Sequence, residues 1–267
     1  MTAPPVGPVR ITSRDNPLLV RLRRLAHDGG AYRRVGQVWL EGDHLCTALR
    51  QRGGVPVCAV LSDSGCADPV LRELASWAAR VVSVPDALFA SLSTLESPAH
   101  IGFVVDMSVV PSPMQGVTTV VLDRLQDAGN VGSILRSAAA FGVQQVLALK
   151  GTVALWSPKV LRAAMGAHFA LRLLEGAEPN LLQDLGLVLV ATSSHAGELL
   201  PSATLPCPCA WVFGHEGQGV SSRVLAMCAL HVRIPQPGGE ESLNVAAAAA
   251  VCFYESARRA ASGIPGQ

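Results

Sequence analysis

The sequence predicts an α/β protein whose C-terminal half is built on a parallel sheet. Five apolar runs in that half alternate with loop and helix patterns, which is typical of a parallel sheet covered on both faces. The first run, residues 117–122, is apolar and β-branched throughout, as expected of a strand buried on both sides. In the first 107 residues, strand and helix patterns alternate over shorter stretches, which indicates a separate, smaller α/β domain.

The elements of the first domain follow from its hydrophobic periodicity and its breakers. We expect helices at 18–32, from Asp43, at 69–79 and from Asp86, and strands at 38–40, 57–61, 81–84 and 101–105. Residues 108–116, which contain two prolines, interrupt the pattern and predict a linker. The predicted organisation is therefore a domain at 1–107, a linker at 108–116 and a second domain at 117–267.

The second domain places its loops at one edge of the predicted sheet. We expect strands at 117–122, 145–149, 187–192, 211–213 and 231–234, and helices at 130–141 and 242–261. Ligands bind such sheets at the carboxyl ends of the strands. The loops that follow Leu122, Thr192, Phe213 and Ile234 are therefore the candidate binding elements.

Composition excludes several classes of protein. Hydrophobic residues make up 49% of the chain and charged residues 15%, so the chain can bury a core and is not a disordered segment. No apolar run approaches the ~20 residues of a membrane span, and residues 1–8 lack a signal-peptide pattern. We therefore expect a cytoplasmic protein without a membrane segment.

Among the 7 cysteines only Cys207 and Cys209 lie close together, and no further Cys or His follows at the spacing of metal ligands, so we expect no metal site.

Charge is concentrated at the N-terminus although the net charge is only +1. Seven arginines stand against two aspartates, and they are Arg10, Arg14, Arg21, Arg23, Arg24, Arg33 and Arg34. Such a patch fits RNA phosphates, and it equally fits a solvated helix face.

Three loops of the second domain carry candidate chemistry. In the first, Asn130 is placed to cap the next helix and Arg136 lies inside that helix. By itself this segment is typical of a capped helix with a surface arginine.

In the second loop, glycines at 214, 217 and 219 follow a strand and allow a ligand to approach the backbone. Their spacing is not that of a dinucleotide-binding turn, and no phosphate-loop lysine follows. The turn itself does not require a glutamate, so Glu216 is a candidate functional residue, whereas His215 is interpreted as a loop residue.

In the third loop, Ser242 or Asn244 is expected to cap the last helix, whose first turn then forms a site for negative charge. The small residues at 246–250 predict tight helix packing.

Together and in this order, the three loops resemble the signature motifs of the SpoU/TrmH family in the SPOUT superfamily. The motifs N-x-G-x-x-x-R, F/L-G-x-E-G-x-G and P-x-x-G-x-x-x-S-L-N-V correspond to residues 130–136, 213–219 and 235–245. The segments 11–17 and 40–42 resemble the L30e-like substrate-binding domain often fused to these enzymes. Ala128 stands where the family usually has proline, and Gln236 where it usually has an apolar residue.

The resemblance implies a trefoil-knotted sheet and an S-adenosyl-L-methionine (SAM)-dependent methyl transfer to a ribose 2′-hydroxyl of RNA. It implies a catalytic set of Arg136, Asn130, Glu216, Ser242 and Asn244. It implies a cofactor pocket at Thr192, Gly214, Gly217, Ile234 and Leu243. It also implies a homodimer that meets through the C-terminal helix.

The linked basic domain favours large-subunit (23S-type) ribosomal RNA as the substrate over tRNA. A tRNA 2′-O-methyltransferase and a non-catalytic RNA-binding or ribosome assembly protein on the same scaffold are the alternatives. A Rossmann-like transferase with a nucleotide cofactor is disfavoured, because the phosphate-loop glycines and the acidic ribose-binding residue are missing.

Overall fold

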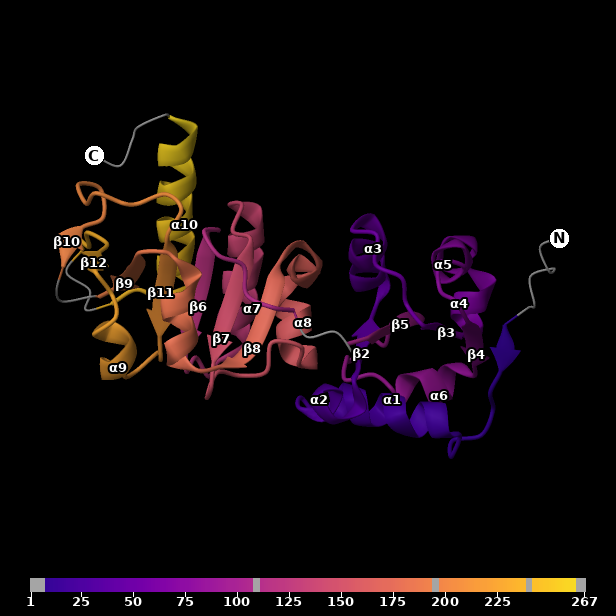
Figure 1. Cartoon of the computed structure of the whole chain (residues 1–267). Helices are drawn as coiled ribbons and strands as arrows, with labels where there is room; N and C mark the ends of the chain where they lie inside the picture. The colour runs from indigo at the N-terminus through magenta and orange to yellow at the C-terminus, as the bar shows by residue number, and fades with distance from the viewer. Residues whose placement is uncertain (1–7, 108–110, 194–196, 239–241, 263–267) are drawn as a thin grey trace. The chain divides into compact units, whose positions relative to one another are not determined.

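The computed structural model describes residues 8–107, 111–193, 197–238 and 242–262, so the first three residues of the predicted linker lie outside it. The chain divides into two compact units, each built on its own sheet (Figure 1). The first unit comprises Met1–Val109 and Trp156–Leu161, and the second comprises Val110–Leu155 and Arg162–Gln267. No helix in the described part of the chain is long and apolar enough to cross a membrane.

The first unit holds a five-stranded mixed sheet of order β1-β4-β3-β5-β2. Its strands are β1 (Val9–Arg10), β2 (Gln37–Glu41), β3 (Cys58–Ser62), β4 (Val81–Val84) and β5 (Ile101–Asp106). Its helices are α1 (Pro17–His27), α2 (Ala31–Val35), α3 (Asp43–Gln51), α4 (Asp63–Ala67), α5 (Pro69–Ala75) and α6 (Asp86–Ala90). Strands β1, β3 and β4 run parallel to one another, and β5 runs antiparallel to both β3 and β2.

The single helix predicted at 18–32 is wrong, because α1 ends at His27 and α2 begins at Ala31. The sequence Asp28-Gly29-Gly30 separates them, and Asp28 Oδ1 accepts a hydrogen bond from the backbone N–H of Gly30 at 2.9 Å. This side chain-to-backbone bond stabilises a turn in place of a further helical turn.

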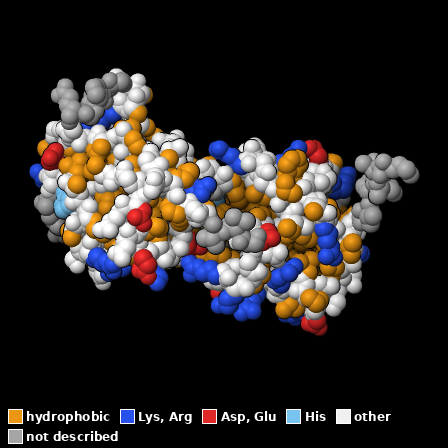
Figure 2. Space-filling model, viewed as in Figure 1, with side chains coloured by type: hydrophobic (Ala, Val, Ile, Leu, Met, Phe, Trp, Pro, Cys, Tyr) orange, Lys and Arg blue, Asp and Glu red, His pale blue; other side chains and the backbone are white. Residues whose placement is uncertain are grey.

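Helix α1 is amphipathic and presents arginine to solvent. It begins after Asn16, whose side chain accepts from the N–H of Leu18, and it buries Leu19, Leu22, Leu25 and Ala26. Arg21 and Arg24 lie exposed on the opposite face. Figure 2 shows basic side chains gathered over α1 and α2.

The second unit holds a seven-stranded sheet of order β10-β12-β9-β11-β6-β7-β8, and every described pair of strands in it is parallel. Its strands are β6 (Thr119–Asp123), β7 (Gln145–Leu149), β8 (Arg172–Ala177), β9 (Leu189–Thr192), β10 (Glu198–Leu199), β11 (Ala210–Gly214) and β12 (Leu230–Arg233). Its helices are α7 (Ala128–Ala140), α8 (Pro158–Ala164, which spans the division between the units), α9 (Ser222–Leu225), α10 (Val245–Ala261) and the 3-10 helices η1 (Ala167–Ala170) and η2 (Pro179–Leu185). The predicted parallel sheet is confirmed, and the trefoil knot stays a prediction.

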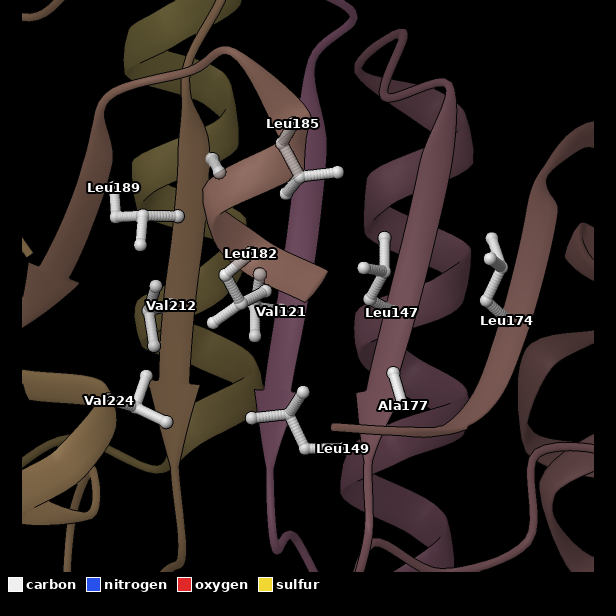
Figure 3. Packing of buried hydrophobic residues seen from close by; sticks show 11 residues of the cluster. Val121, Leu147, Leu149, Leu174, Ala177, Leu182, Leu185, Leu189, Val212 and Val224 are labelled. Atoms are coloured by element: carbon white, nitrogen blue, oxygen red, sulfur yellow. The ribbon is translucent and has the colours of Figure 1, made fainter. Parts of the chain in front are cut away.

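Helices cover both faces of this sheet. On one face, Leu182 and Leu185 of η2 pack on side chains from β6, β7, β8, β9 and β11 (Figure 3). On the other face, α7 and α10 lie side by side (Figure 3). The aromatic rings of Phe213 in β11 and Phe253 in α10 meet edge to face at a centroid distance of 5.6 Å. Because strand side chains alternate, β11 contributes Val212 to one core and Phe213 to the other.

Candidate active site

The described residues of the second unit line a cavity of about 770 Å³, partly open to solvent, at the carboxyl ends of β9, β11 and β12. The cavity lies next to the point where the strand order reverses, since β6 is continued by β7 and β8 on one side while β11 and β9 lie on its other side. A reversal of strand order of this kind opens a crevice between the loops. The cavity is lined by Asn130, Thr192, Ser193, Gly214, His215, Glu216, Gly217, Gln218, Gly219, Val220, Leu225, Ile234, Gln236, Ser242, Leu243, Asn244, Val245 and Ala248.

Nine of the ten residues predicted from the sequence line this cavity. They are Asn130, Glu216, Ser242, Asn244, Thr192, Gly214, Gly217, Ile234 and Leu243. Arg136 is the exception: it lies exposed on α7 and outside the lining. Within the described part of the chain, its guanidinium makes no hydrogen bond or ion pair.

The expectation that Asn130 caps the helix after β6 is wrong. Helix α7 begins two residues earlier, at Ala128, and its cap is Asp127, whose Oδ1 accepts from the N–H of Asn130 at 2.7 Å. Asn130 therefore stands in the first turn, and its side chain is available for contacts with other loops.

Those contacts form a relay of hydrogen bonds between all three loops. Asn244, one of the two predicted candidates, caps α10, because its Oδ1 accepts from the N–H groups of Ala246 and Ala247. Its Nδ2 consequently points outward and donates to Asn130 Oδ1 at 2.9 Å. Asn130 Nδ2 in turn donates to Glu216 Oε1 at 3.2 Å. The direction of each amide is thus fixed by its neighbours.

The relay ends on a carboxylate that holds the start of α7. Glu216 accepts from the backbone N–H groups of Gln126 at 3.2 Å and of Asp127 at 3.1 Å. Partial burial raises the pKa of Glu216, and hydrogen bonds from its own backbone N–H, Asp127, Asn130 and Gln126 outweigh that effect, so the net pKa is lowered. Glu216 is therefore ionised near neutral pH and serves as an anionic anchor for the two loops.

The turn after β11 folds back on itself tightly. A Cβ on Gly214 would lie 2.1 Å from the backbone of Gly219 and Val220, so the glycine is required by the turn before any ligand is considered. Gly219 has a φ of +68°, a conformation that favours glycine. A Cβ on Gly217 would meet only the His215 ring, at 3.9 Å, which leaves open space at that position.

His215 shapes the turn with its side chain, beyond what the sequence predicted. Its Nδ1 accepts from the backbone N–H of Gly217 at 3.0 Å and of Gln218 at 3.3 Å. Both bonds run from the backbone of the turn to the ring of a residue within it. His215 is therefore a structural member of the cavity wall.

Two residues next to the first loop were also missed. Asp123 is buried, and its Oδ2 accepts from the N–H of Ser221 at 2.6 Å, which fixes the far end of the turn. Arg124 has a φ of +63°, uncommon for a residue with a side chain, and its Nη1 donates to Gln218 Oε1 at 3.1 Å. Asp123 could have been identified from the sequence, because it is a polar residue at the end of a predicted strand. Nothing in the sequence distinguishes Arg124.

The geometry can hold a ligand with apolar parts and a few polar groups. Leu225, Ile234, Leu243 and Val245 supply apolar surface, and the 214–219 turn supplies backbone groups. Among the described residues, no group of three or more His, Cys, Asp or Glu side chains is arranged to hold a metal ion.

Comparison with known proteins gives one consistent result. The model of the SpoU rRNA Methylase family matches residues 117–254. A tRNA/rRNA methyltransferase of Synechocystis, described as uncharacterized, is 35% identical over 96% of both chains. The 23S rRNA (uridine(2479)-2′-O)-methyltransferase of Streptomyces viridochromogenes is 28% identical over 95% of this chain and 93% of that protein. A solved RNA 2′-O ribose methyltransferase has a TM-score of 0.78 and 30% identity over 95% of this chain and all of its own.

Proposed function

Because the chain belongs to the SpoU rRNA methylase family, we propose that it transfers the methyl group of SAM to a ribose 2′-hydroxyl of large-subunit ribosomal RNA. The observation that carries this proposal is the convergence of nine predicted site residues on one cavity, joined by the relay from Asn244 through Asn130 to Glu216. Full-length similarity to a 23S rRNA 2′-O-methyltransferase supports the RNA class.

The cavity fits SAM in size and character. Its volume of about 770 Å³ lies within the range of small-molecule sites. Apolar side chains suit the base, and the open backbone near Gly217 suits the polar end of the cofactor. SAM, when bound, supplies a methyl group on a positively charged sulfur. Thr192, Gly214, Gly217, Ile234 and Leu243 are the residues proposed to hold it.

The chain's own contribution to the reaction is positioning and charge. Glu216 and Asn130 hold the loops at the cavity in a fixed mutual arrangement. Ser242 and Asn244 lie exposed at the start of the 17-residue helix α10, where the helix dipole favours negative charge. They are proposed to orient the ribose, so that the 2′-hydroxyl oxygen meets the methyl carbon in line.

Arg136 is proposed to bind the phosphate next to the reacting ribose and to stabilise the developing alkoxide. A guanidinium stays protonated in proteins, so Arg136 is not the base. The adjacent phosphate is the proposed proton acceptor. Arg136→Lys is expected to lose most turnover, because lysine lacks the bidentate fork.

A second copy of the chain is proposed to complete the site. On α7 the residues Ser133, Arg136 and Ala140 form an exposed stripe, and on α10 the residues Val251 and Tyr254 are 40% and 56% exposed. The two stripes meet where the ring of Phe141 packs edge-on against Tyr254, with centroids 6.0 Å apart. Covering this face in a homodimer buries the apolar groups and places Arg136 at the interface.

The arginines of α1 and α2 are the proposed contact of the first unit with RNA. Arg21, Arg24, Arg33 and Arg34 lie exposed on this helix pair, where they attract phosphate without reading sequence (Figure 2). On this proposal the protein works in the cytoplasm, on ribosomal RNA.

Calorimetric titration with SAM tests the proposal. We expect saturable binding with one site per chain, and loss of that binding in Leu243→Arg. Leu243 is 41% exposed, so this change fills the cavity mouth without disturbing a core, and an unchanged melting temperature checks that. A folded protein that does not bind SAM would contradict the proposal and favour an RNA-binding role on the same scaffold.

A further inference from the structure

Arg124, the residue that follows β6, has a backbone conformation that normally belongs to glycine. Its φ is +63°, and a residue with a side chain adopts such an angle only at a cost in free energy. Two hydrogen bonds hold its backbone: Thr152 Oγ1 accepts from the N–H of Arg124 at 3.0 Å, and Gln126 Nε2 donates to its carbonyl oxygen at 3.0 Å. The strained conformation is therefore fixed by its surroundings.

The side chain of Arg124 leads from this position to the turn after β11. Its stem passes Gly151, where a Cβ would lie 3.2 Å from Arg124 Cγ. Its guanidinium then meets two groups: Nη1 donates to Gln218 Oε1 at 3.1 Å, and Nε lies 3.4 Å from Oδ1 of the buried Asp123. Gln218 belongs to the turn, and Asp123 anchors the end of the turn through the N–H of Ser221.

The bond to Gln218 is one of several that tie this turn to the residues after β6. Glu216 and Ser221 are held by backbone and carboxylate groups of residues 123–127. Gln218 stands between them, lines the cavity and is exposed to solvent. Because an exposed glutamine otherwise samples several rotamers, the bond from Arg124 decides which way its amide faces.

Stability by itself favours glycine at position 124. Glycine adopts a positive φ without steric cost, and both backbone hydrogen bonds would remain, since neither involves the side chain of residue 124. An arginine kept in a strained conformation beside a cavity is explained most directly by what its side chain holds there.

We propose that Arg124 is a positioning residue, which orients Gln218 and holds the middle of the turn in the shape that binds SAM. This inference rests on the proposed function, since it assumes that the cavity binds SAM. A wall that is ordered before the ligand arrives loses less conformational freedom on binding, so the contact raises affinity. Arg124 itself lies outside the cavity lining, so its effect falls on the KM for SAM and not on kcat.

The test is calorimetry with SAM on three single variants. Arg124→Met keeps an unbranched side chain and removes the guanidinium, and we expect about fivefold weaker binding. Gln218→Met removes the acceptor and should give a similar loss; because Gln218 is exposed, this variant serves even if Arg124→Met does not fold. Arg223→Met is the matched control, expected to bind as wild type. Arg223 also donates to an amide oxygen, that of Asn180 at 2.7 Å, and it lies outside the cavity lining.

The double variant of Arg124 and Gln218 shows whether the two residues act together. We expect it to bind no more weakly than the weaker single variant, because the second change removes a partner of a contact that is already lost. In steady-state assays Arg124→Met should raise the KM for SAM by a similar factor and leave kcat within about twofold of wild type. A loss of fold stability alone would instead lower the number of binding sites and leave the Kd of the folded molecules unchanged.

The outcomes separate this inference from the proposed function. Wild-type affinity in a folded Arg124→Met protein would overturn the role of Arg124 and leave SAM binding intact. Effects that multiply in the double variant would overturn it too, since Arg124 would then act by another route, such as its ion pair with Asp123. An equal loss in Arg223→Met would do the same, because binding would then follow overall charge. If the wild-type protein bound no SAM, the proposed function itself would fail, and this inference with it.

Discussion

Replacing Asn130 with aspartate should convert the relay between the loops into a pH-dependent contact. Aspartate has nearly the same shape and keeps the oxygen that accepts from Asn244. It replaces the Nδ2 donor with a second carboxylate oxygen, which then stands about where Nδ2 now lies 3.2 Å from Glu216 Oε1. Two carboxylates would face one another where an amide and a carboxylate now bind.

The size of the effect follows from the lost bond and the new repulsion. A hydrogen bond to an ionised acceptor contributes about 1.5–3 kcal/mol. Two unit charges at this separation repel by about 1 kcal/mol even with the dielectric constant of water. Because Glu216 is exposed to solvent, which weakens both terms, we expect Asn130→Asp to lower the free energy of unfolding by about 1–2 kcal/mol at pH 8.

Acid should reverse part of this loss. The facing carboxylates raise the pKa of one member of the pair above its value in the unfolded chain, so the folded state takes up a proton first. Stability is then regained as the pH falls towards that raised pKa. At pH 5 the variant should recover about 0.4 kcal/mol relative to Asn130→Ala, which lacks the second carboxylate, because a repulsion of about 1 kcal/mol raises the pKa by less than one unit.

The assay is urea unfolding followed by circular dichroism at pH 8 and pH 5. Because the chain has two units, the transition to be analysed is the one that SAM shifts to higher urea. Parallel pH dependence of the aspartate and alanine variants would refute the reasoning, since it would mean that position 130 does not face the carboxylate of Glu216.

Three further predictions concern the turn and the second copy. Gly214→Ala should lower the melting temperature and abolish SAM binding measured by calorimetry, because its Cβ would lie 2.1 Å from backbone atoms of Gly219 and Val220. Gly217→Ala should leave the melting temperature unchanged, and equal melting temperatures of the two variants would contradict the close approach at Gly214. Tyr254→Glu should convert the proposed dimer to a monomer in analytical ultracentrifugation, because it places a charge on an apolar face where Tyr254 is 56% exposed; a dimer that persists would place the interface elsewhere. Mixing inactive Arg136→Ala and Leu243→Arg proteins should restore roughly a quarter of the wild-type activity. Half of the randomly formed dimers are mixed, and each mixed dimer has one intact site out of two. No restoration would show that Arg136 serves its own chain's cavity.

The sequence predicted the elements whose patterns are local. Strands β4 and β7 fall where expected, at Val81–Val84 and Gln145–Leu149, because each is a short apolar run between clear breakers. The meeting of the loops at one cavity also followed, since parallel strands bring their carboxyl ends to the same edge.

Features that depend on three-dimensional contacts were not predictable in the same way. Strand β8 was missed because it is an edge strand whose apolar run is interrupted by Glu175 and Gly176. Asp127 and Asn130 are both good caps, and only the backbone path decides between them. The left-handed conformation of Arg124 leaves no local pattern in the sequence at all.

The central claim is that methyl transfer occurs at a ribose 2′-hydroxyl. Its most direct test is incubation of the protein with methyl-labelled SAM and deproteinised ribosomal RNA, followed by alkaline hydrolysis. A methylated 2′-oxygen cannot attack the neighbouring phosphate, so we predict label in alkali-resistant dinucleotides from the large-subunit RNA, and none with Leu243→Arg. Label released in mononucleotides would place the methyl group on a base and contradict the account.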